Sequence, residues 1–128
     1  MRFPENIKYT KDHEWISVDG NIGTIGITDF AQGELGDVVF IDIDPSISEV
    51  KKGDSFGSIE AVKTVSEIYA PCSGKIVEVN KELADNPELV NSDPYGLGWM
   101  VKIEIKEMSE LNGLLDNKAY EQQLGQES

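Results

Sequence analysis

The sequence has few of the residues on which several classes of protein depend. Cys72 is its single cysteine, which excludes an intrachain disulfide and leads us to expect a reducing compartment. Only 11 residues are Lys or Arg, against 24 Asp or Glu. Because phosphate binding needs basic patches, we expect no nucleic-acid partner. His13 is the single histidine, so we expect no metal site and give His13 an orienting or core role.

Long hydrophobic runs are also missing. No uninterrupted apolar stretch approaches the length that spans a bilayer, so we expect no membrane partner. The first residues lack the apolar segment of a secretory signal, and an Arg- and Ser-rich transit segment is missing as well. By elimination we expect a cytoplasmic protein from a bacterium. The net charge of −13 favours encounters with basic surfaces on partner proteins.

The residues that are present predict one folded domain. Aliphatic, aromatic and Cys residues make up 39% of the 128 positions, which is enough for a real core. We interpret residues 1–128 as a single domain. Its core is expected over 7–105, a helical segment over 106–124 and a frayed tail over 125–128.

Runs of β-branched and aromatic residues separated by turn signals predict a mainly β fold. The run at 38–43 is expected to be buried on both faces at its start. The predicted strands are residues 7–9, 14–18, 22–27, 38–43, 55–61, 64–70, 75–79 and 99–105.

A short helix is predicted over residues 28–35. Thr28 is a good N-cap, Asp29 suits the positive end of the helix, and Gly36 is placed to end it. Three apolar residues are expected to share one face of this helix, namely Phe30, Ala31 and Leu35.

Helical character returns towards the end of the chain. Residues 81–84 predict one helical turn, and residues 85–98, rich in Pro and Gly, predict a loop. Residues 109–115 and 116–124 predict helices, the second of them capped by Asp116.

The two predicted strands at 55–61 and 64–70 flank Val62 and Lys63, where the chain must reverse. A tight hairpin usually places Asn-Gly or Asp-Gly at this point, since those residues tolerate positive φ. Val-Lys stands there instead. A local rule broken without visible local gain indicates function, although a solvated charge on a hairpin tip is the simpler explanation of Lys63.

The residues around Lys63 match a known pattern. The segment from Lys52-Gly53-Asp54 to Ser73-Gly74-Lys75 resembles the lipoyl and biotinyl carrier fold, in which one lysine on an exposed turn is modified. Biotin carriers usually flank that lysine with methionines, whereas Val62 and Thr64 flank it here. The resemblance therefore favours lipoyl over biotin.

Four longer segments narrow the resemblance to one family, and together they cover almost the whole chain in order. The sequence is similar to H proteins of the glycine cleavage system. The matching segments are His13-Glu14-Trp15, GITDFAQGELGDVVFIDI at 26–43, EAVKTVSEIYAP at 60–71 and NPELVNSDPYGLGWMVKI at 86–103.

The resemblance implies a barrel-sandwich hybrid of two small antiparallel sheets, with a short helix near 28–35 and C-terminal helices near 109–124. It also implies lipoic acid bound covalently as N6-lipoyllysine at Lys63, on a carrier that is not itself an enzyme. The residues expected to identify the attachment turn to a modifying enzyme are Glu60, Val62, Thr64 and Glu67. The two glutamates are explained equally well as solvated carboxylates on strands.

The family resemblance also implies a set of partners. A pyridoxal-phosphate glycine decarboxylase would load the aminomethyl group, a tetrahydrofolate-dependent aminomethyltransferase would remove it, and a dihydrolipoyl dehydrogenase using FAD and NAD would reoxidise the dithiol. A lipoate ligase or lipoyltransferase would attach the group. The alternatives are a relay that delivers lipoyl groups to other proteins, or a lipoyl domain of a 2-oxo acid dehydrogenase complex.

A carrier gains by folding the loaded arm into a dry cleft, because the cargo is unstable in water. Glu14 is expected to pair with the cargo amine through a charge-assisted hydrogen bond. The residues expected to form the walls of this cleft are Ile27, Phe30, Ala31 and Leu35. The competing interpretation is an ordinary hairpin carboxylate and an ordinary core helix.

Overall fold

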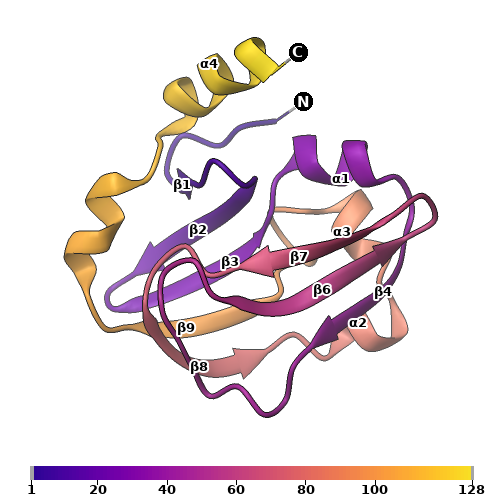
Figure 1. Cartoon of the computed structure of the whole chain (residues 1–128), viewed down its shortest axis with the longest axis horizontal. Coiled ribbons are helices and arrows are strands. Elements are labelled where there is room, and N and C mark those ends of the chain that lie inside the picture. The colour runs from indigo at the N-terminus through magenta and orange to yellow at the C-terminus, as the bar shows by residue number, and fades with distance from the viewer. Residues whose placement is uncertain (1, 128) are drawn as a thin grey trace.

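The structure is a computed structural model that describes residues 2–127, and two antiparallel sheets form most of it (Figure 1). The larger sheet has six strands in the order β1-β2-β3-β9-β8-β5, and the smaller has three in the order β4-β6-β7. The predicted pair of antiparallel sheets is confirmed. The larger sheet consists of β1 (Lys8–Tyr9), β2 (Glu14–Asp19), β3 (Ile22–Ile27), β5 (Glu49–Val50), β8 (Gly74–Val79) and β9 (Val101–Ile105). The smaller consists of β4 (Val38–Ile43), β6 (Ser55–Ala61) and β7 (Val65–Tyr69).

The hairpin of β2 and β3 follows from its turn residues. Gly20 adopts a φ of 64°, which the missing side chain permits without strain. The pairs Asp19↔Ile22 and Glu14↔Ile27 mark the two ends of the ladder. Glu14 and Ile27 are therefore held opposite each other, next to the start of the first helix.

The smaller sheet has one buried and one exposed face. Ile41, Ile59 and Ile68 point into the core, and each is at most 9% exposed. The register of β4 on β6 shifts between Val38 and Phe40. This irregularity places both Val39 and Phe40 outward, at 51% exposure each. The prediction that this strand is buried on both faces at its start is wrong, because the register shift breaks the alternation of the strand.

The core consists of two clusters. The larger lies between the sheets, where Ile25, Phe56, Ile103 and other aliphatic residues pack together with the buried Cys72. Burial raises the pKa of the Cys72 thiol to about 11, as expected for a small core residue and not for a reactive cysteine. The smaller cluster joins Tyr9, Trp15 and Tyr120 with Ile7 and Leu124.

The first helix, α1 (Asp29–Leu35), has the caps that its sequence predicts. The Thr28 side chain accepts a hydrogen bond from the N–H of Ala31, and Gly36 ends the helix with a φ of 79°. The apolar residues of α1 do not share one environment. Phe30 packs against the smaller cluster, whereas Ala31 and Leu35 pack against the larger.

Two one-turn helices, α2 (Glu82–Asp85) and α3 (Leu89–Ser92), lie between β8 and β9. The first matches the turn predicted at 81–84. The second lies inside the region predicted as a loop, where Val90 is completely buried and holds the turn against the core. A helix of one turn is too short to show the repeating spacing of apolar residues by which a helix is recognised in a sequence.

The chain ends in the 3-10 helix η1 (Met108–Gly113) and the α-helix α4 (Asn117–Glu127). Asp116 accepts a hydrogen bond from the N–H of Ala119 at 2.8 Å, so it caps α4 as predicted. Helix α4 continues to Glu127, beyond the predicted end at Leu124. The last residue of the predicted frayed tail, Ser128, lies outside the described residues. No helix within residues 2–127 is both long and apolar enough to cross a bilayer.

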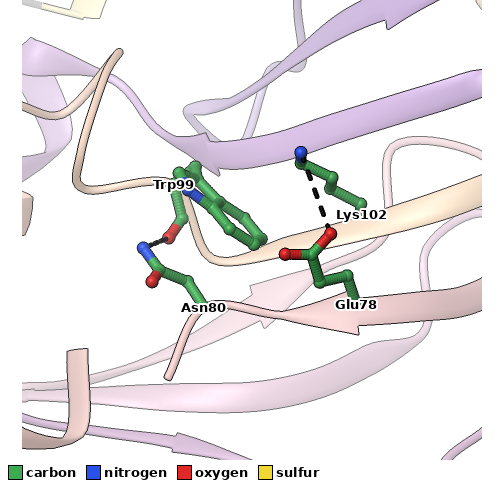
Figure 2. A network of polar contacts seen from close by, with 4 residues as sticks. All are labelled: Glu78, Asn80, Trp99 and Lys102. Carbon is green, nitrogen blue, oxygen red and sulfur yellow. Dashed lines mark hydrogen bonds and ion pairs between the residues drawn. The ribbon is translucent and has the colours of Figure 1, made fainter. Parts of the chain in front are cut away.

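A polar network fastens the loop before β9 to the larger sheet (Figure 2). Asn80 donates to the carbonyl oxygens of Leu97 at 2.9 Å and Trp99 at 2.7 Å. The Lys102 ammonium lies 3.9 Å from Glu78 and 5.0 Å from the Trp99 ring centre. This network stabilises β8 and β9, the sheet opposite the one that holds Lys63.

Candidate functional site

Lys63 lies exposed on the turn between β6 and β7, which projects beside the loop from α1 to β4 (Figure 1). The N–H of Ala61 donates to the carbonyl of Thr64 at 2.8 Å, and the N–H of Val62 donates to the carbonyl of Asp37 at 3.0 Å. Within residues 2–127, His13 is the one non-glycine residue with positive φ. The turn at Lys63 therefore needs no left-handed backbone, which explains why it contains no Gly or Asn.

The Lys63 side chain lies against the end of α1. A Cβ placed on Gly36 would meet Cε of Lys63 at 3.6 Å and its Cδ at 3.8 Å. The aliphatic part of the lysine thus packs over a glycine, whose lack of a side chain leaves room for it. This contact places the stem of the lysine next to the C-terminal end of α1.

Asn91, on α3, connects the segments that support the Lys63 turn. Its side-chain oxygen accepts from the N–H of Val38 at 2.8 Å. Its amide donates to the carbonyl of Gly36 at 2.9 Å and to the Gln32 side chain at 3.0 Å. One side chain therefore fixes the end of α1 to the start of β4, on either side of Asp37. Sequence reasoning missed Asn91 because the bonds join residues more than 50 positions apart.

The four residues predicted to mark the turn lie close to Lys63 and are exposed. Val62 is 71% exposed. Glu60, on β6, lies opposite both Phe40 and Val65, whereas Glu67 lies opposite Ser58 one row further along. Thr64 completes the turn. Residues opposite each other in a sheet share a face, so Glu60 and Glu67 occupy the outer face of the smaller sheet.

Glu14 is only 2% exposed, although it is ionisable. Its carboxyl accepts from the Thr10 hydroxyl at 2.7 Å and from the N–H of Tyr69 at 3.4 Å. Burial raises the pKa of this carboxyl to about 7, and the nearby Asp12 adds to the increase while the hydrogen bonds oppose it. Glu14 is thus poised between its neutral and charged forms near neutral pH.

Glu14 faces a cavity of about 460 Å³ between the end of β7 and the segment that precedes α4. Its walls include Tyr9, Lys52, Tyr69, Pro71, Leu114 and Gln123. The other residues predicted for the arm cleft do not line this cavity. Phe30 is turned towards the smaller cluster, where its ring lies 5.0 Å from that of His13. Ile27 is 5% exposed, and Ala31 and Leu35 are half-buried on the larger cluster.

Helix α1 has Lys63 near its C-terminal end and the partner strand residue of Glu14 near its N-terminal end. Its C-terminal end contacts Lys63 at Gly36. Its N-cap, Thr28, follows Ile27, which is paired with Glu14 in the β2–β3 ladder. Seven residues of helix measure about 10 Å. That distance is shorter than an extended lysine side chain with an acyl chain attached to it.

The N-terminal end of α1 is fastened to α4. The Tyr120 hydroxyl is hydrogen-bonded to the Thr28 hydroxyl at 2.7 Å and to Nδ1 of His13 at 2.8 Å. The Tyr120 ring stacks on Tyr9, with centres 4.8 Å apart. His13 thus lies next to the N-cap of α1, hydrogen-bonded to the same hydroxyl as Thr28. Sequence reasoning missed the role of the Tyr120 hydroxyl, since its contacts lie about 100 positions away in the chain.

The described residues contain no group of three or more His, Cys, Asp or Glu side chains placed to hold a metal ion. The predicted site residues form two separate regions of the structure. One is the exposed turn at Lys63 with the outer face of the smaller sheet. The other is the buried Glu14 with its cavity.

Comparison with known proteins identifies the family. The family model described as glycine cleavage H-protein matches residues 7–127. The glycine cleavage system H protein of Carboxydothermus hydrogenoformans is 56% identical over 124 residues, covering 97% of this chain and 95% of the relative. That of Staphylococcus haemolyticus is 53% identical over 126 residues, covering 98% of this chain and 100% of the relative.

The fold agrees with a solved structure. The crystal structure of a glycine cleavage system H protein from Mycobacterium marinum superposes with a TM-score of 0.87 at 38% identity. The match covers 96% of this chain and 99% of the other. These findings confirm the resemblance seen in the sequence, and the chain belongs to the glycine cleavage H-protein family.

Proposed function

We propose that this chain is the carrier of a glycine cleavage system, with a lipoyl group attached to Lys63. The observation that carries the proposal is an exposed lysine on a turn whose backbone is held by hydrogen bonds from Ala61 to Thr64 and from Val62 to Asp37. Family membership supplies the chemistry expected there. The relatives come from bacteria, and we place the protein in a bacterial cytoplasm.

The rigidity of the turn suits modification by another enzyme. A lysine amine is protonated at neutral pH, so a lipoate ligase or lipoyltransferase must remove a proton before the amine can be acylated. A flexible loop would lose conformational entropy on entering the active site of that enzyme. The bonds from Ala61 and Val62 fix the turn before the encounter, and Lys63 is presented already ordered.

The residues of this chain would hold and shelter the arm, and they would perform no bond chemistry themselves. The lipoyl group would supply a strained disulfide that accepts the aminomethyl cargo and releases it. Gly36 leaves room for the stem of Lys63. Ala31 and Leu35, half-buried on α1 against the larger cluster, are proposed to contact the aliphatic part of the arm.

Glu14 is proposed to bind the protonated amine of the cargo. A cation placed in the cavity would favour the charged form of a carboxyl whose pKa is about 7 in the free protein. The pair would form away from bulk water, where a charge-assisted hydrogen bond is strongest. Ile27 would support Glu14 from the adjacent strand. Phe30 packs against the smaller cluster.

The proposed partners are the enzymes of the same system. They are a glycine decarboxylase with pyridoxal phosphate, a tetrahydrofolate-dependent aminomethyltransferase and a dihydrolipoyl dehydrogenase with FAD and NAD. Combining the lipoylated chain with these three enzymes distinguishes a carrier from a relay of lipoyl groups. A carrier supports continuous release of CO2 from glycine, whereas a relay accepts the lipoyl group and does not support turnover.

The attachment point is tested by intact-mass measurement after expression with a lipoate ligase. We expect one lipoyl-sized addition on the parent and none on Lys63→Arg. Lys75→Arg is the matched control, because Lys75 is another exposed lysine in the same chain, on β8 of the larger sheet. It should keep the addition. A lipoylated Lys63→Arg variant would refute the assignment.

The role of Glu14 is tested by the lifetime of the loaded cargo. Glu14→Gln keeps the shape of the side chain and removes the charge that would bind the amine. We expect faster loss of the aminomethyl group from this variant than from the parent, and unchanged loss from Glu104→Gln, whose residue is exposed on β9. Equal lifetimes in all three proteins would remove Glu14 from the role.

A further inference from the structure

We propose that the outer face of the smaller sheet is the docking surface for the enzyme that acylates Lys63. This inference rests on the proposed function. We call this surface the Phe40 face. It consists of the row Phe40, Glu60 and Val65 and the adjacent row Asp42, Ser58 and Glu67. The partner it fits is a protein surface with an apolar centre and a rim of Lys or Arg side chains.

The centre of the Phe40 face is apolar and unusually exposed. Phe40 is 51% exposed and Val65 63%, and both lie directly opposite Glu60 in the ladder. Val39 and Val62 extend the exposed apolar surface towards the turn, at 51% and 71%. Single exposed apolar residues are ordinary, but a group of neighbours on one face is typical of an interaction site.

The rim of the Phe40 face is acidic. Asp42, Glu60 and Glu67 are exposed on it, and strands β4, β6 and β7 contain no Lys or Arg. Lys63, at the turn, is the nearest cation in sequence to Glu60 and Glu67. An approaching basic surface is therefore attracted to this face, and its apolar centre is then covered on contact.

The Phe40 face lies next to the turn that a lysine-modifying enzyme must approach. Val65 is two residues from Lys63 and Glu60 is three, which corresponds to roughly 7 to 10 Å along the strands. An active site that takes in the Lys63 side chain must reach across this distance. A second copy of the chain is a poorer occupant, since pairing two such faces would bring like charges together.

Docking can be measured without the chemistry by using Lys63→Arg, which keeps the positive charge and cannot be acylated. Calorimetric titration with a lipoate ligase gives the Kd of this variant. Adding Phe40→Ser or Val65→Ser should weaken binding by about tenfold, as expected for residues at the centre of an interface. Adding Val77→Ser, a matched change at a valine 48% exposed on β8, should leave the Kd unchanged.

The acidic rim is tested by kinetics and salt on the chain with Lys63 intact. Glu60→Gln with Glu67→Gln should raise the KM for lipoylation several-fold with little change in kcat, because docking affects binding and not the acylation step. The double variant should also lose most of the salt dependence of the parent. Glu104→Gln, on the other sheet, should behave as the parent.

The outcomes separate this inference from the proposed function. If the parent is lipoylated at Lys63 but the Phe40 face variants bind and react like the Val77→Ser control, the docking surface is wrong and the carrier assignment stands. If the parent is not lipoylated at Lys63, the proposed function itself fails. A change in oligomeric state of Phe40→Ser without ligase, seen by sedimentation, would identify a contact between copies and overturn the inference.

Discussion

The N–H of Val62 donates to the carbonyl oxygen of Asp37 at 3.0 Å, and this bond joins the Lys63 turn to the loop between α1 and β4. It couples a turn in the middle of the chain to a loop more than 20 positions earlier. Since Asn91 holds the residues on both sides of Asp37, the position of Lys63 depends on a side chain in α3.

We expect Asn91→Asp to slow lipoylation. The aspartate can still accept from Val38 but faces the oxygens of Gly36 and Gln32 without a donor, which should cost about 1–3 kcal/mol of unfolding free energy. The freed loop should also raise the hydrogen-exchange rate of the Val62 amide. Mass spectrometry measures the lipoylation rate and the exchange of the Val62 amide, and denaturation measures the change in unfolding free energy.

Asn80→Asp is the control for that prediction. Asn80 also donates two bonds to oxygens and accepts one from a backbone N–H, but it lies on the larger sheet (Figure 2). Its change should destabilise the protein to a similar extent while leaving Val62 exchange and lipoylation near the parent values. Equal slowing of lipoylation by both variants would show that Asn91 acts only through global stability.

The titration of Glu14 predicts how stability varies with pH. Because its folded pKa, about 7, lies above the ordinary value of 4.5, the folded state holds a proton that the unfolded state releases. The stabilisation of the folded state by this proton is complete below about pH 4.5 and is lost as pH rises through 7. Between pH 5 and 8 the parent should lose about 2 kcal/mol relative to Glu14→Gln. Urea denaturation across this range measures the difference, and parallel pH profiles would contradict it.

Tyr120→Phe should loosen the contact of α4 with α1. The change removes the hydroxyl bonded to Thr28 and His13, keeps the stacking on Tyr9, and should lower the unfolding free energy by about 1–3 kcal/mol. Tyr69→Phe is the control at a tyrosine 37% exposed on an outer strand. Thermal denaturation compares the two, and similar midpoints would show that the Tyr120 hydroxyl contributes little.

Two glycines should respond oppositely to alanine. Gly33 lies within α1 with open space around its Cβ position, so Gly33→Ala should stabilise the protein by about 0.5–1 kcal/mol. At Gly57 a Cβ would lie 2.5 Å from the carbonyl oxygen of Asp42. Gly57→Ala should therefore separate β4 from β6 and lower the denaturation midpoint. A stable Gly57→Ala variant would mean that the two strands can move apart at little cost.

Much of the fold was predictable because its signals are local. The Asp19-Gly20 turn, the Thr28 cap and the Asp116 cap each act within a few residues. The burial of β4 was predicted wrongly because a register shift is a property of two paired strands. One turn of helix at α3 was missed because its burial, at Val90, depends on the rest of the fold.

The candidate site divides in the same way. Lys63 was singled out because a turn without Gly or Asn broke a local rule, and the structure adds that a bond to Asp37 supports that turn. No local signal in the sequence indicated the bonds made by the supporting residues Asn91 and Tyr120, since these bonds join residues 53 and 92 positions apart. Phe30 was grouped with Ala31 by proximity in sequence, but the helix turns them to different clusters.

The short turn that carries Lys63 has a consequence for proteolysis. Exposed loop tips are ordinarily where proteases cut, and a lysine there would be a site for trypsin-like enzymes. Only Val62, Lys63 and Thr64 separate β6 from β7, and the N–H of Val62 and the carbonyl of Thr64 are already hydrogen-bonded. A protease would have to pull the two strands apart to extend the peptide in its active site, so the chain can expose its amine while the adjoining peptide bond resists cleavage.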